Sequence, residues 1–278
     1  MSLLADILAS KRREIDVLRA RPRAPSSRRP RDVVTALRRR PAGPAPLVKP
    51  RLPTAVFNRP LRLVAEVKLR SPSAGPLSRA LAPEARALAY ARSGASMVSV
   101  LCDGPFFDGS WEHLAAARAR LDADGSAVPL LAKEFILDPR QIAQARDYGA
   151  DAVLLIARIV DEAELGRLVR TARDEALEPM VEVVDEAELA AALAAGARIV
   201  GVNARDLDSL AMDAARTARV LAAIPPDVVA VHLSGLRVPL DVAAVAQGRS
   251  DAALVGEALM RQDDPRGLLE AMVEAAGT

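Results

Sequence analysis

Residues 151–184 read DAVLLIARIVDEAELGRLVRTARDEALEPMVEVV, and this stretch decides the fold that the sequence predicts. Residues 152–156 and 178–183 are short runs rich in apolar residues, as expected of buried strands. Residues 161–176, between them, repeat apolar positions with a helical period. Two strands joined by such a helix pair in parallel through a right-handed crossover. The stretch is therefore a strand–helix–strand unit of an α/β protein.

The same alternation continues along the chain from residue 61. Strand-like runs lie at 61–68, 97–101, 128–133, 152–156, 178–183, 199–203, 228–233 and 252–255. Helical patterns at 82–93, 139–148, 161–176 and 185–195 separate several of them. Gly94, Gly149 and Gly196 follow three of these patterns, at positions where glycine commonly ends a helix. The sequence therefore predicts eight strands with helical connections.

Eight such units predict a closed (β/α)8 barrel, the TIM barrel. A doubly wound open sheet is the alternative. It is disfavoured because no Gly-x-Gly-x-x-Gly turn follows the first strand, and because polar residues end nearly all strands. We expect an N-terminal helical extension and basic linker at residues 1–60 and the barrel at residues 61–278, together forming one structural domain.

The composition indicates a cytoplasmic protein without membrane spans. Cys102 is the only cysteine, so no internal disulfide can form and a reducing compartment is expected. The uncharged apolar stretches fall well short of the roughly 18 residues that span a bilayer. The amino terminus lacks the basic and apolar regions of a secretion signal. We therefore expect no membrane partner and no processing.

Basic residues are concentrated in residues 11–51, which contain fourteen Lys or Arg and three acidic residues, while the whole chain carries a net charge of +2. Such a segment can be a nucleic-acid-binding arm. It lacks interleaved aromatic residues, however, so we expect no nucleic-acid partner. The interpretation that we prefer is a solvated helical extension whose positive charge raises the local concentration of an anionic substrate.

Polar residues gather at the carboxyl ends of the predicted strands, where barrels of this type carry their active sites. They are Glu66, Lys68, Lys133, Glu182, Asn203, Ser234, Gly235, Gly256 and Glu257. Glu66 and Lys68 are two residues apart and therefore share one face of a strand. Two lysines facing one cavity indicate an anionic ligand. Phosphate is favoured, because the seventh and eighth strands are followed by the loops that often bind it.

Several strings resemble signatures of the indole-3-glycerol phosphate synthase family, in the order in which that family has them. They are VAEVKLRSPSAG (64–75), SVLCDGPFFDGS (99–110), AKEFILDP (132–139), DAVLLIA (151–157), VEVVDEAEL (181–189), VGVNARDL (200–207) and LVGEALM (254–260). Residues 3–15, LLADILASKRREI, resemble its leading helix. The resemblance covers essentially the whole chain.

The resemblance implies a carboxy-lyase of tryptophan biosynthesis that needs no metal or organic cofactor. It implies a phosphorylated small-molecule substrate, 1-(2-carboxyphenylamino)-1-deoxyribulose 5-phosphate, which loses CO2 and water to give indole-3-glycerol phosphate. On the matching motifs, Lys133 would be the general acid for ring closure and Glu182 would handle the proton of the dehydration. Lys68 would pair with the substrate carboxylate or act as a further acid.

The resemblance also implies binding residues. Asn203 would hold a sugar hydroxyl or orient a carboxylate. The expected phosphate site consists of Ser71, Gly235, Gly256 and Glu257, the last three acting largely through backbone amides. The expected apolar walls around the aromatic ring are Phe106, Phe107, Phe135 and Leu155. Glu66, Leu233 and Ser234 complete the expected substrate-binding set.

Leu233 departs from the family pattern, because the seventh strand of the family usually ends in Glu-Ser-Gly and here the stretch is AVHLSGL (230–236). A leucine cannot accept a hydrogen bond or balance a lysine. The adjacent His232 would point away from the cavity on an ideal strand. Two milder departures are Glu134, where Asp is common, and Cys102, where Thr is frequent. Cys102 is expected to be a small residue of the pocket wall.

Three alternatives remain open beside the family reaction. A divergent paralogue could act on a modified substrate, and a non-catalytic barrel could keep only phosphate binding; Leu233 favours both. A phosphoribosylanthranilate isomerase would want a Cys and Asp pair at suitable strand ends and fits poorly. The sequence does not decide between a primary and a specialised pathway, nor whether the substrate ring carries substituents. We expect a monomer, with no metal site.

Overall fold

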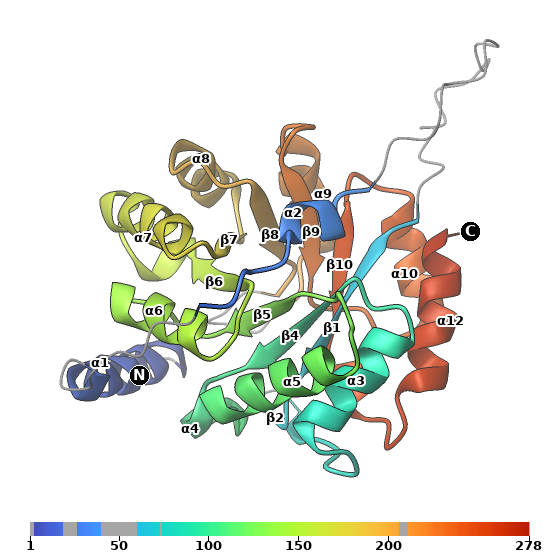
Figure 1. Ribbon diagram of the computed structural model, residues 1–278. Coiled ribbons are helices and arrows are strands. Elements are labelled where there is room, and N and C mark those ends of the chain that lie inside the picture. The colour runs from blue at the N-terminus through green and yellow to red at the C-terminus, as the bar shows by residue number, and fades with distance from the viewer. Residues whose placement is uncertain (1–2, 19–26, 40–59, 73, 206–210, 278) are drawn as a thin grey trace, which may run out of the picture.

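The computed structural model describes residues 3–18, 27–39, 60–72, 74–205 and 211–277. Within them, eight parallel strands close into a barrel in the order β1-β10-β9-β8-β7-β6-β5-β4 (Figure 1). The strands are β1 Arg62–Val67, β4 Met97–Leu101, β5 Leu130–Lys133, β6 Ala152–Ile156, β7 Glu178–Val183, β8 Ile199–Asn203, β9 Val229–Leu233 and β10 Ala252–Val255. Each lies within one of the predicted runs, so the predicted (β/α)8 barrel is confirmed.

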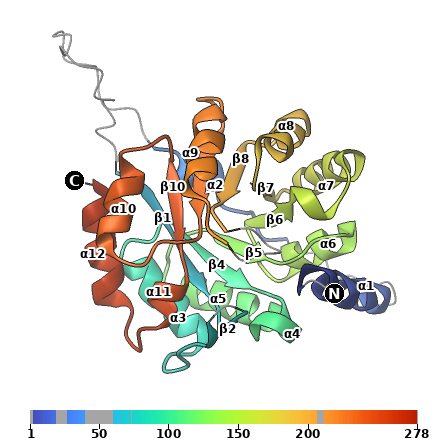
Figure 2. The same ribbon diagram turned by 180° about the vertical axis from the view of Figure 1, so that it is seen from behind.

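Helices surround the barrel, and α10 and α12 lie side by side in Figure 2. The longer ones are α3 Pro83–Arg92, α5 Trp111–Ala123, α6 Pro139–Asp147, α7 Glu162–Asp174, α8 Glu186–Ala194, α9 Ala214–Ala223, α10 Pro239–Ala246 and α12 Arg266–Gly277. The short ones are α4 Gly104–Phe107, α11 Glu257–Met260 and the 3-10 helix η1 Ala157–Ile159. Asp138, Asp161, Asp185 and Asp213 accept backbone hydrogen bonds as N-caps. Gly94, Gly149 and Gly196 have left-handed backbone after their helices, as predicted.

Side chains alternate between two separate cores along each strand. One core fills the barrel interior and includes Val64, Met97 and Leu131. The other lies between the strands and the surrounding helices and includes Leu63 and Val98. This alternation follows from the two-residue period of a strand. It determines which residue at each strand end faces the interior.

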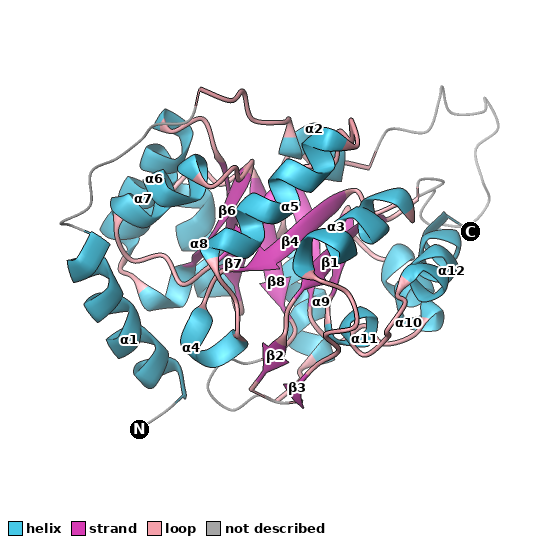
Figure 3. Ribbon diagram, turned by 60° about the horizontal axis from the view of Figure 1, so that its bottom comes forward, coloured by secondary structure: helices cyan, strands magenta, loops and turns pink. Residues whose placement is uncertain are grey.

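Two N-terminal helices pack at opposite ends of the barrel (Figure 3). Helix α2, Val33–Leu37, lies at the amino ends of the strands, where Val33 and Leu37 join the interior core. Helix α1, Leu3–Leu18, lies at the carboxyl ends and buries Ile7 and Ile15. The expectation of a solvated extension is therefore wrong for the described part of residues 1–60. Residues 19–26 and 40–59 of the predicted extension and basic linker lie outside the described residues.

Arginines of the described segment 27–39 contact main-chain carbonyls at the amino end of the barrel. Arg28 donates to the carbonyls of Gly149 and Ala150, at 3.1 and 2.6 Å, just after helix α6. Arg39 donates to the carbonyl of Ala246, the last residue of α10, at 2.9 Å. Helices end here with unpaired carbonyls and partial negative charge. These two arginines thus fasten the chain to the barrel.

Asp151 is the centre of this attachment. Its carboxylate is buried and lies 2.8 Å from Arg28 Nη1 and 3.3 Å from Arg118 Nη1. It also accepts hydrogen bonds of 2.8 Å from the backbone nitrogens of Arg31 and Leu130. One buried carboxylate therefore joins the N-terminal segment, helix α5 and strand β5.

We expect Asp151→Asn to lower the free energy of unfolding by about 3–5 kcal/mol, because it removes a fully buried carboxylate that pairs with Arg28 and with the buried Arg118. Urea denaturation followed by circular dichroism measures the change. Asp122→Asn is the control: Asp122 also pairs with Arg31 and Arg118, but its side chain is 47% exposed, so the expected loss is below about 1 kcal/mol. Equal losses in both variants would contradict the central role of Asp151.

A small hairpin of β2, Arg70–Ser71, and β3, Gly75–Pro76, follows β1 and was not predicted. Its strands have two residues each, too few for an apolar alternation to be visible in the sequence. It lies at the carboxyl end of the barrel, where it positions Ser71 (Figure 3). Within the described residues, no helix has both the length and the apolar character needed to cross a membrane.

Candidate active site

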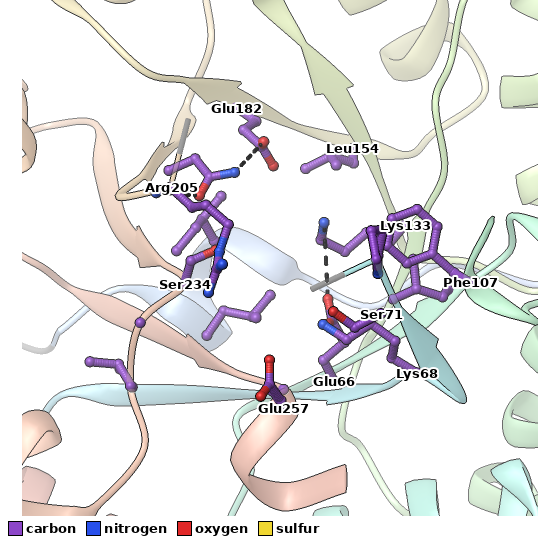
Figure 4. A pocket seen from close by; sticks show the side chains of 18 of the residues that line it. Glu66, Lys68, Ser71, Phe107, Lys133, Leu154, Glu182, Arg205, Ser234 and Glu257 are labelled. Carbon is purple, nitrogen blue, oxygen red and sulfur yellow. Dashed lines mark hydrogen bonds and ion pairs between the residues drawn. The ribbon is translucent and has the colours of Figure 1, made fainter. Parts of the chain in front are cut away.

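A pocket of about 520 Å³ opens at the carboxyl ends of the barrel strands. This volume is within the range usual for small-molecule sites. The residues of the sequence-predicted set that line it are Glu66, Lys68, Ser71, Phe107, Lys133, Phe135, Glu182, Asn203, Leu233, Ser234, Gly235, Gly256 and Glu257. They come from almost every strand end, as Figure 4 shows for the residues that it labels. The predicted site is thus brought together almost completely.

Glu66 bridges two lysines on one side of the pocket. Its Oε1 lies 2.7 Å from Lys68 Nζ, and its Oε2 lies 4.0 Å from Lys133 Nζ. Burial works to raise the pKa of Glu66, but the two ammonium groups outweigh burial and hold the pKa below its ordinary value. Two positive charges therefore face the cavity with one carboxylate to balance them. This arrangement has a net positive charge and attracts an anion.

Gly256 makes room for this carboxylate. A Cβ atom at residue 256 would lie 2.6 Å from Glu66 Oε1, closer than any real contact. The backbone at the end of β10 can therefore approach Glu66 only because residue 256 has no side chain. The glycine expected at the phosphate end of the pocket thus also fixes the position of the carboxylate that holds both lysines.

Glu182 lies across the pocket from the lysines (Figure 4), and Asn203 is its hydrogen-bond partner. Asn203 Nδ2 donates to Glu182 Oε1 at 2.8 Å, and the Asn203 side chain in turn accepts from the backbone of Arg205 at 3.0 Å. Glu182 is buried, yet its Oε2 has no hydrogen-bond partner among the residues that the structure describes. A buried carboxylate oxygen without a partner, facing a cavity, is suited to accept a proton or a hydroxyl group from a ligand.

The loop after β9 has unusual backbone geometry. Ser234 and Gly235 are both left-handed, with φ of 70° and 90°. A serine rarely adopts this conformation, and strain of this kind clusters at functional sites. Arg205 and Arg237 line the same part of the pocket. The motif VGVNARDL contains Arg205, and Arg237 directly follows the stretch AVHLSGL, but neither arginine was singled out as a site residue.

Apolar side chains form the wall on the Lys133 side. The rings of Phe107 and Phe135 lie 6.0 Å apart between centroids, and both line the pocket. Helix α1 contributes Leu3, Leu4 and Ile7 to the lining. The predicted leading helix therefore supplies part of the site itself. This wall is suited to an aromatic group of a ligand, because both aromatic rings and aliphatic side chains line it.

Three expectations for the walls are wrong. Leu155 faces the surrounding helices, because its neighbours Leu154 and Ile156 are the residues of β6 that point into the barrel and line the pocket. Cys102 also packs against the helices. Phe106 contacts the interior core but does not line the pocket.

His232 points away from the pocket, as predicted, and its Nε2 lies 3.1 Å from the carbonyl oxygen of Ser234. Burial lowers the pKa of His232. The histidine therefore does not substitute for the glutamate that Leu233 replaces. Leu233 itself is 2% exposed and lines the pocket beside Asn203, its partner in the register of β8 and β9.

Comparison with known proteins shows to which protein family the chain belongs. The family model of indole-3-glycerol phosphate synthase matches residues 4–272. This chain belongs to the indole-3-glycerol phosphate synthase family. The synthases of this family are enzymes of tryptophan biosynthesis, and the function of the chain is that of an indole-3-glycerol phosphate synthase.

Relatives in the family support the same conclusion over most of this chain. The chain is 45% identical to an indole-3-glycerol phosphate synthase of Roseiflexus sp. (strain RS-1), covering 74% of this chain and 78% of the relative. It is 40% identical to the multifunctional tryptophan biosynthesis protein of Schizosaccharomyces pombe, covering 73% of this chain and 27% of that protein. A thiamine phosphate pyrophosphorylase from Pyrococcus furiosus shares the fold, with a TM-score of 0.58 at 15% identity over 78% of this chain and 95% of that one.

The Leu233 side chain of this family member packs against Gly201. A Cβ at residue 201 would lie 2.6 Å from Leu233 Cδ1, so the leucine fits against the bare backbone of β8. The side chain therefore occupies space on the pocket side of β9 without strain. The departure removes an acceptor from the site while keeping the barrel interior packed.

Proposed function

We propose that the chain is a carboxy-lyase that converts 1-(2-carboxyphenylamino)-1-deoxyribulose 5-phosphate to indole-3-glycerol phosphate, CO2 and water. The observation that carries the proposal is the pair of lysines held by Glu66 in the pocket of a family member. Across the pocket lies Glu182, whose Oε2 is unpaired within the described ranges. The net positive side fits the carboxylate and phosphate of the substrate, and the Phe107 and Phe135 wall fits its ring.

Ring closure is the first step. The ring carbon that bears the carboxylate attacks the ketone carbon, and the ketone oxygen takes a proton from Lys133. The bond to the carboxylate then breaks, its electron pair returns to the ring, and CO2 leaves. Lys68 pairs with the carboxylate before this loss. Glu66 keeps both ammonium groups in place, because it contacts each of them.

Dehydration is the second step. The new hydroxyl group leaves as water with a proton from Lys68, acting now as a further acid, and Glu182 removes the proton whose loss forms the pyrrole double bond. The net change is the loss of CO2 and water. Asn203 donates to Glu182 Oε1 and so leaves Oε2 as the oxygen that accepts the proton. We assign the phosphate to Ser71 and to the backbone amides of residues 235, 256 and 257.

Steady-state formation of the indole product, followed by fluorescence, tests the proposal. We expect wild type to turn over the carboxyphenylamino-deoxyribulose phosphate and to release one CO2 per indole formed. A wild type that binds this substrate without forming indole would reject the reaction. The alternatives of a modified substrate or of a barrel that only binds phosphate would then apply.

Leu233→Glu tests the departure from the family pattern. We expect kcat/KM to rise about tenfold, because a carboxylate beside Asn203 adds a charged acceptor worth about 1.5 kcal/mol to a substrate hydroxyl. Leu233→Met is the matched control, since it keeps an apolar side chain of similar size, and it is expected to leave kcat/KM unchanged. A fall in kcat/KM for Leu233→Glu would show that the leucine is an adaptation of this site.

A phosphorylated small molecule is the partner that we propose. The expectations of a monomer, of no nucleic-acid or membrane partner, and of a cytoplasmic location stay predictions. The family-implied absence of a cofactor is likewise a prediction. Measurements on the protein in solution and of its location in the cell test these predictions.

A further inference from the structure

A buried ionic cluster lies behind the apolar wall of the pocket. Lys11 of α1 is 1% exposed, and its Nζ lies 2.8 Å from Asp103 Oδ1 and 3.0 Å from Glu134 Oε1. Both carboxylates are buried as well, while Glu14 adds a third contact of 2.8 Å from the partly exposed side. The reaction steps above use none of these side chains. Their burial therefore calls for a different explanation.

Each buried carboxylate also holds the backbone of the aromatic wall. Asp103 is the N-cap of α4, and its Oδ2 accepts from the backbone nitrogen of Phe106 at 2.9 Å, one residue before Phe107. Glu134 Oε1 accepts from the backbone nitrogen of Phe135 at 2.7 Å. One ammonium group thus connects the two loops whose rings, Phe107 and Phe135, lie against each other in the wall.

The same ammonium holds helix α1 against the barrel. Ile7 lies one turn before Lys11, on the same buried face of α1, and lines the pocket with Leu3 and Leu4. Burial raises the pKa of Glu134 to about 7, and Asp103 adds to this rise while Lys11 opposes it. Without the lysine, two buried carboxylates would face each other with no cation between them, an arrangement that proteins avoid.

We propose that Lys11 is a positioning residue that holds α1 and the loops bearing Phe107 and Phe135 together as one wall, and that this wall recognises the aromatic end of the substrate. The proposal deepens the proposed function and rests on it for the identity of the ligand. The two ends of the pocket then have separate roles. The Lys11 cluster controls binding of the aromatic ring, and the loops after β9 and β10 bind the phosphate independently.

Direct binding of two probes tests the proposal without turnover. Anthranilate, which is fluorescent, reports on the aromatic end, and inorganic phosphate, measured by calorimetry, reports on the other end. We expect Lys11→Met to weaken anthranilate binding at least about tenfold and phosphate binding less than about twofold. Arg13→Met is the matched control: it removes the same charge from the exposed face of α1 and should change neither affinity.

Kinetics give a second readout that general damage to the fold would not produce. We expect Lys11→Met to raise KM for the substrate about tenfold with kcat within about threefold of wild type, because uniform binding is lost and the chemistry is not. Lys11→Arg keeps the cation and should recover most of the KM. An unchanged anthranilate affinity in Lys11→Met, or equal losses of both probes, would overturn the proposal.

Failure of this proposal is distinguishable from failure of the proposed function. A wild type that binds anthranilate but forms no indole rejects the reaction, and the binding assay still decides the role of Lys11. If circular dichroism shows that Lys11→Met does not fold, Asp103→Asn replaces it, because asparagine can still cap α4 but lacks the charge. The same selective loss of anthranilate binding is expected there, and its absence would overturn the proposal.

Discussion

Lys133→Ala is expected to lower kcat between about a hundredfold and ten-thousandfold, the range typical of a lost general acid. The reason is geometric. The ammonium group of Lys133 lies at the carboxyl end of β5, 4.0 Å from the Glu66 carboxylate, and faces the cavity. Alanine removes the proton that the ketone oxygen needs during ring closure. Single-turnover measurement of indole formation and of CO2 release detects the loss, and both should fall together because ring closure precedes both.

Lys133→Met is the informative companion. Methionine keeps most of the length and apolar stem of the lysine, so a loss equal to that of alanine would show that the charge matters and the shape does not. Arg140→Ala, an exposed position on α6, serves as the control and should retain full activity. A fall in kcat smaller than about tenfold for Lys133→Ala would remove Lys133 from the role of general acid.

Glu182→Gln is expected to lower the rate of indole formation by about a hundredfold or more while CO2 release is affected much less. Glutamine keeps an oxygen that can accept from Asn203 Nδ2, so the local geometry should persist. It removes the second oxygen, Oε2, which has no partner in the described part of the chain and would accept the proton during dehydration. The expected result is therefore a decarboxylated, still hydroxylated intermediate.

Rapid mixing with simultaneous measurement of CO2 and indole fluorescence tests this separation of steps. A burst of CO2 that precedes indole supports the assignment of Glu182 to the dehydration. Glu186→Gln on the neighbouring helix α8 is the control, because its side chain is 53% exposed and pairs with Arg219 on the surface. Parallel loss of CO2 and indole in Glu182→Gln would instead place this carboxylate in ring closure.

The eight strands could be predicted from the sequence because each is a short, separate apolar run, and because the strand–helix alternation admits few topologies. The site could be predicted because polar residues at the ends of such strands must converge in a barrel. Leu155 was assigned to the wrong face because the run AVLLI is apolar at every position. Only the register with β7, which pairs Ile156 with Glu182, shows that Leu154 and Ile156 point inward.

Other features could not be predicted, because they depend on contacts between distant parts of the chain. Lys11 occurs in an ordinary amphipathic helix, and its partners Asp103 and Glu134 are far away in sequence. The periodicity nevertheless carried a signal, since Ile7, Lys11 and Ile15 fall on one helical face. A lysine between two apolar residues of such a face indicates a buried cation, and therefore a carboxylate partner from another part of the chain.

The attachment of segment 27–39 has a consequence for how this sequence can change over generations. Arg28 and Arg39 bind to oxygen atoms of the main chain, which every residue type possesses. A substitution at Ala246 therefore leaves the acceptor of Arg39 in place, whereas loss of Arg39 removes the donor. Selection on these contacts acts on one partner alone. Arg39 should persist in descendants in which residue 246 has changed.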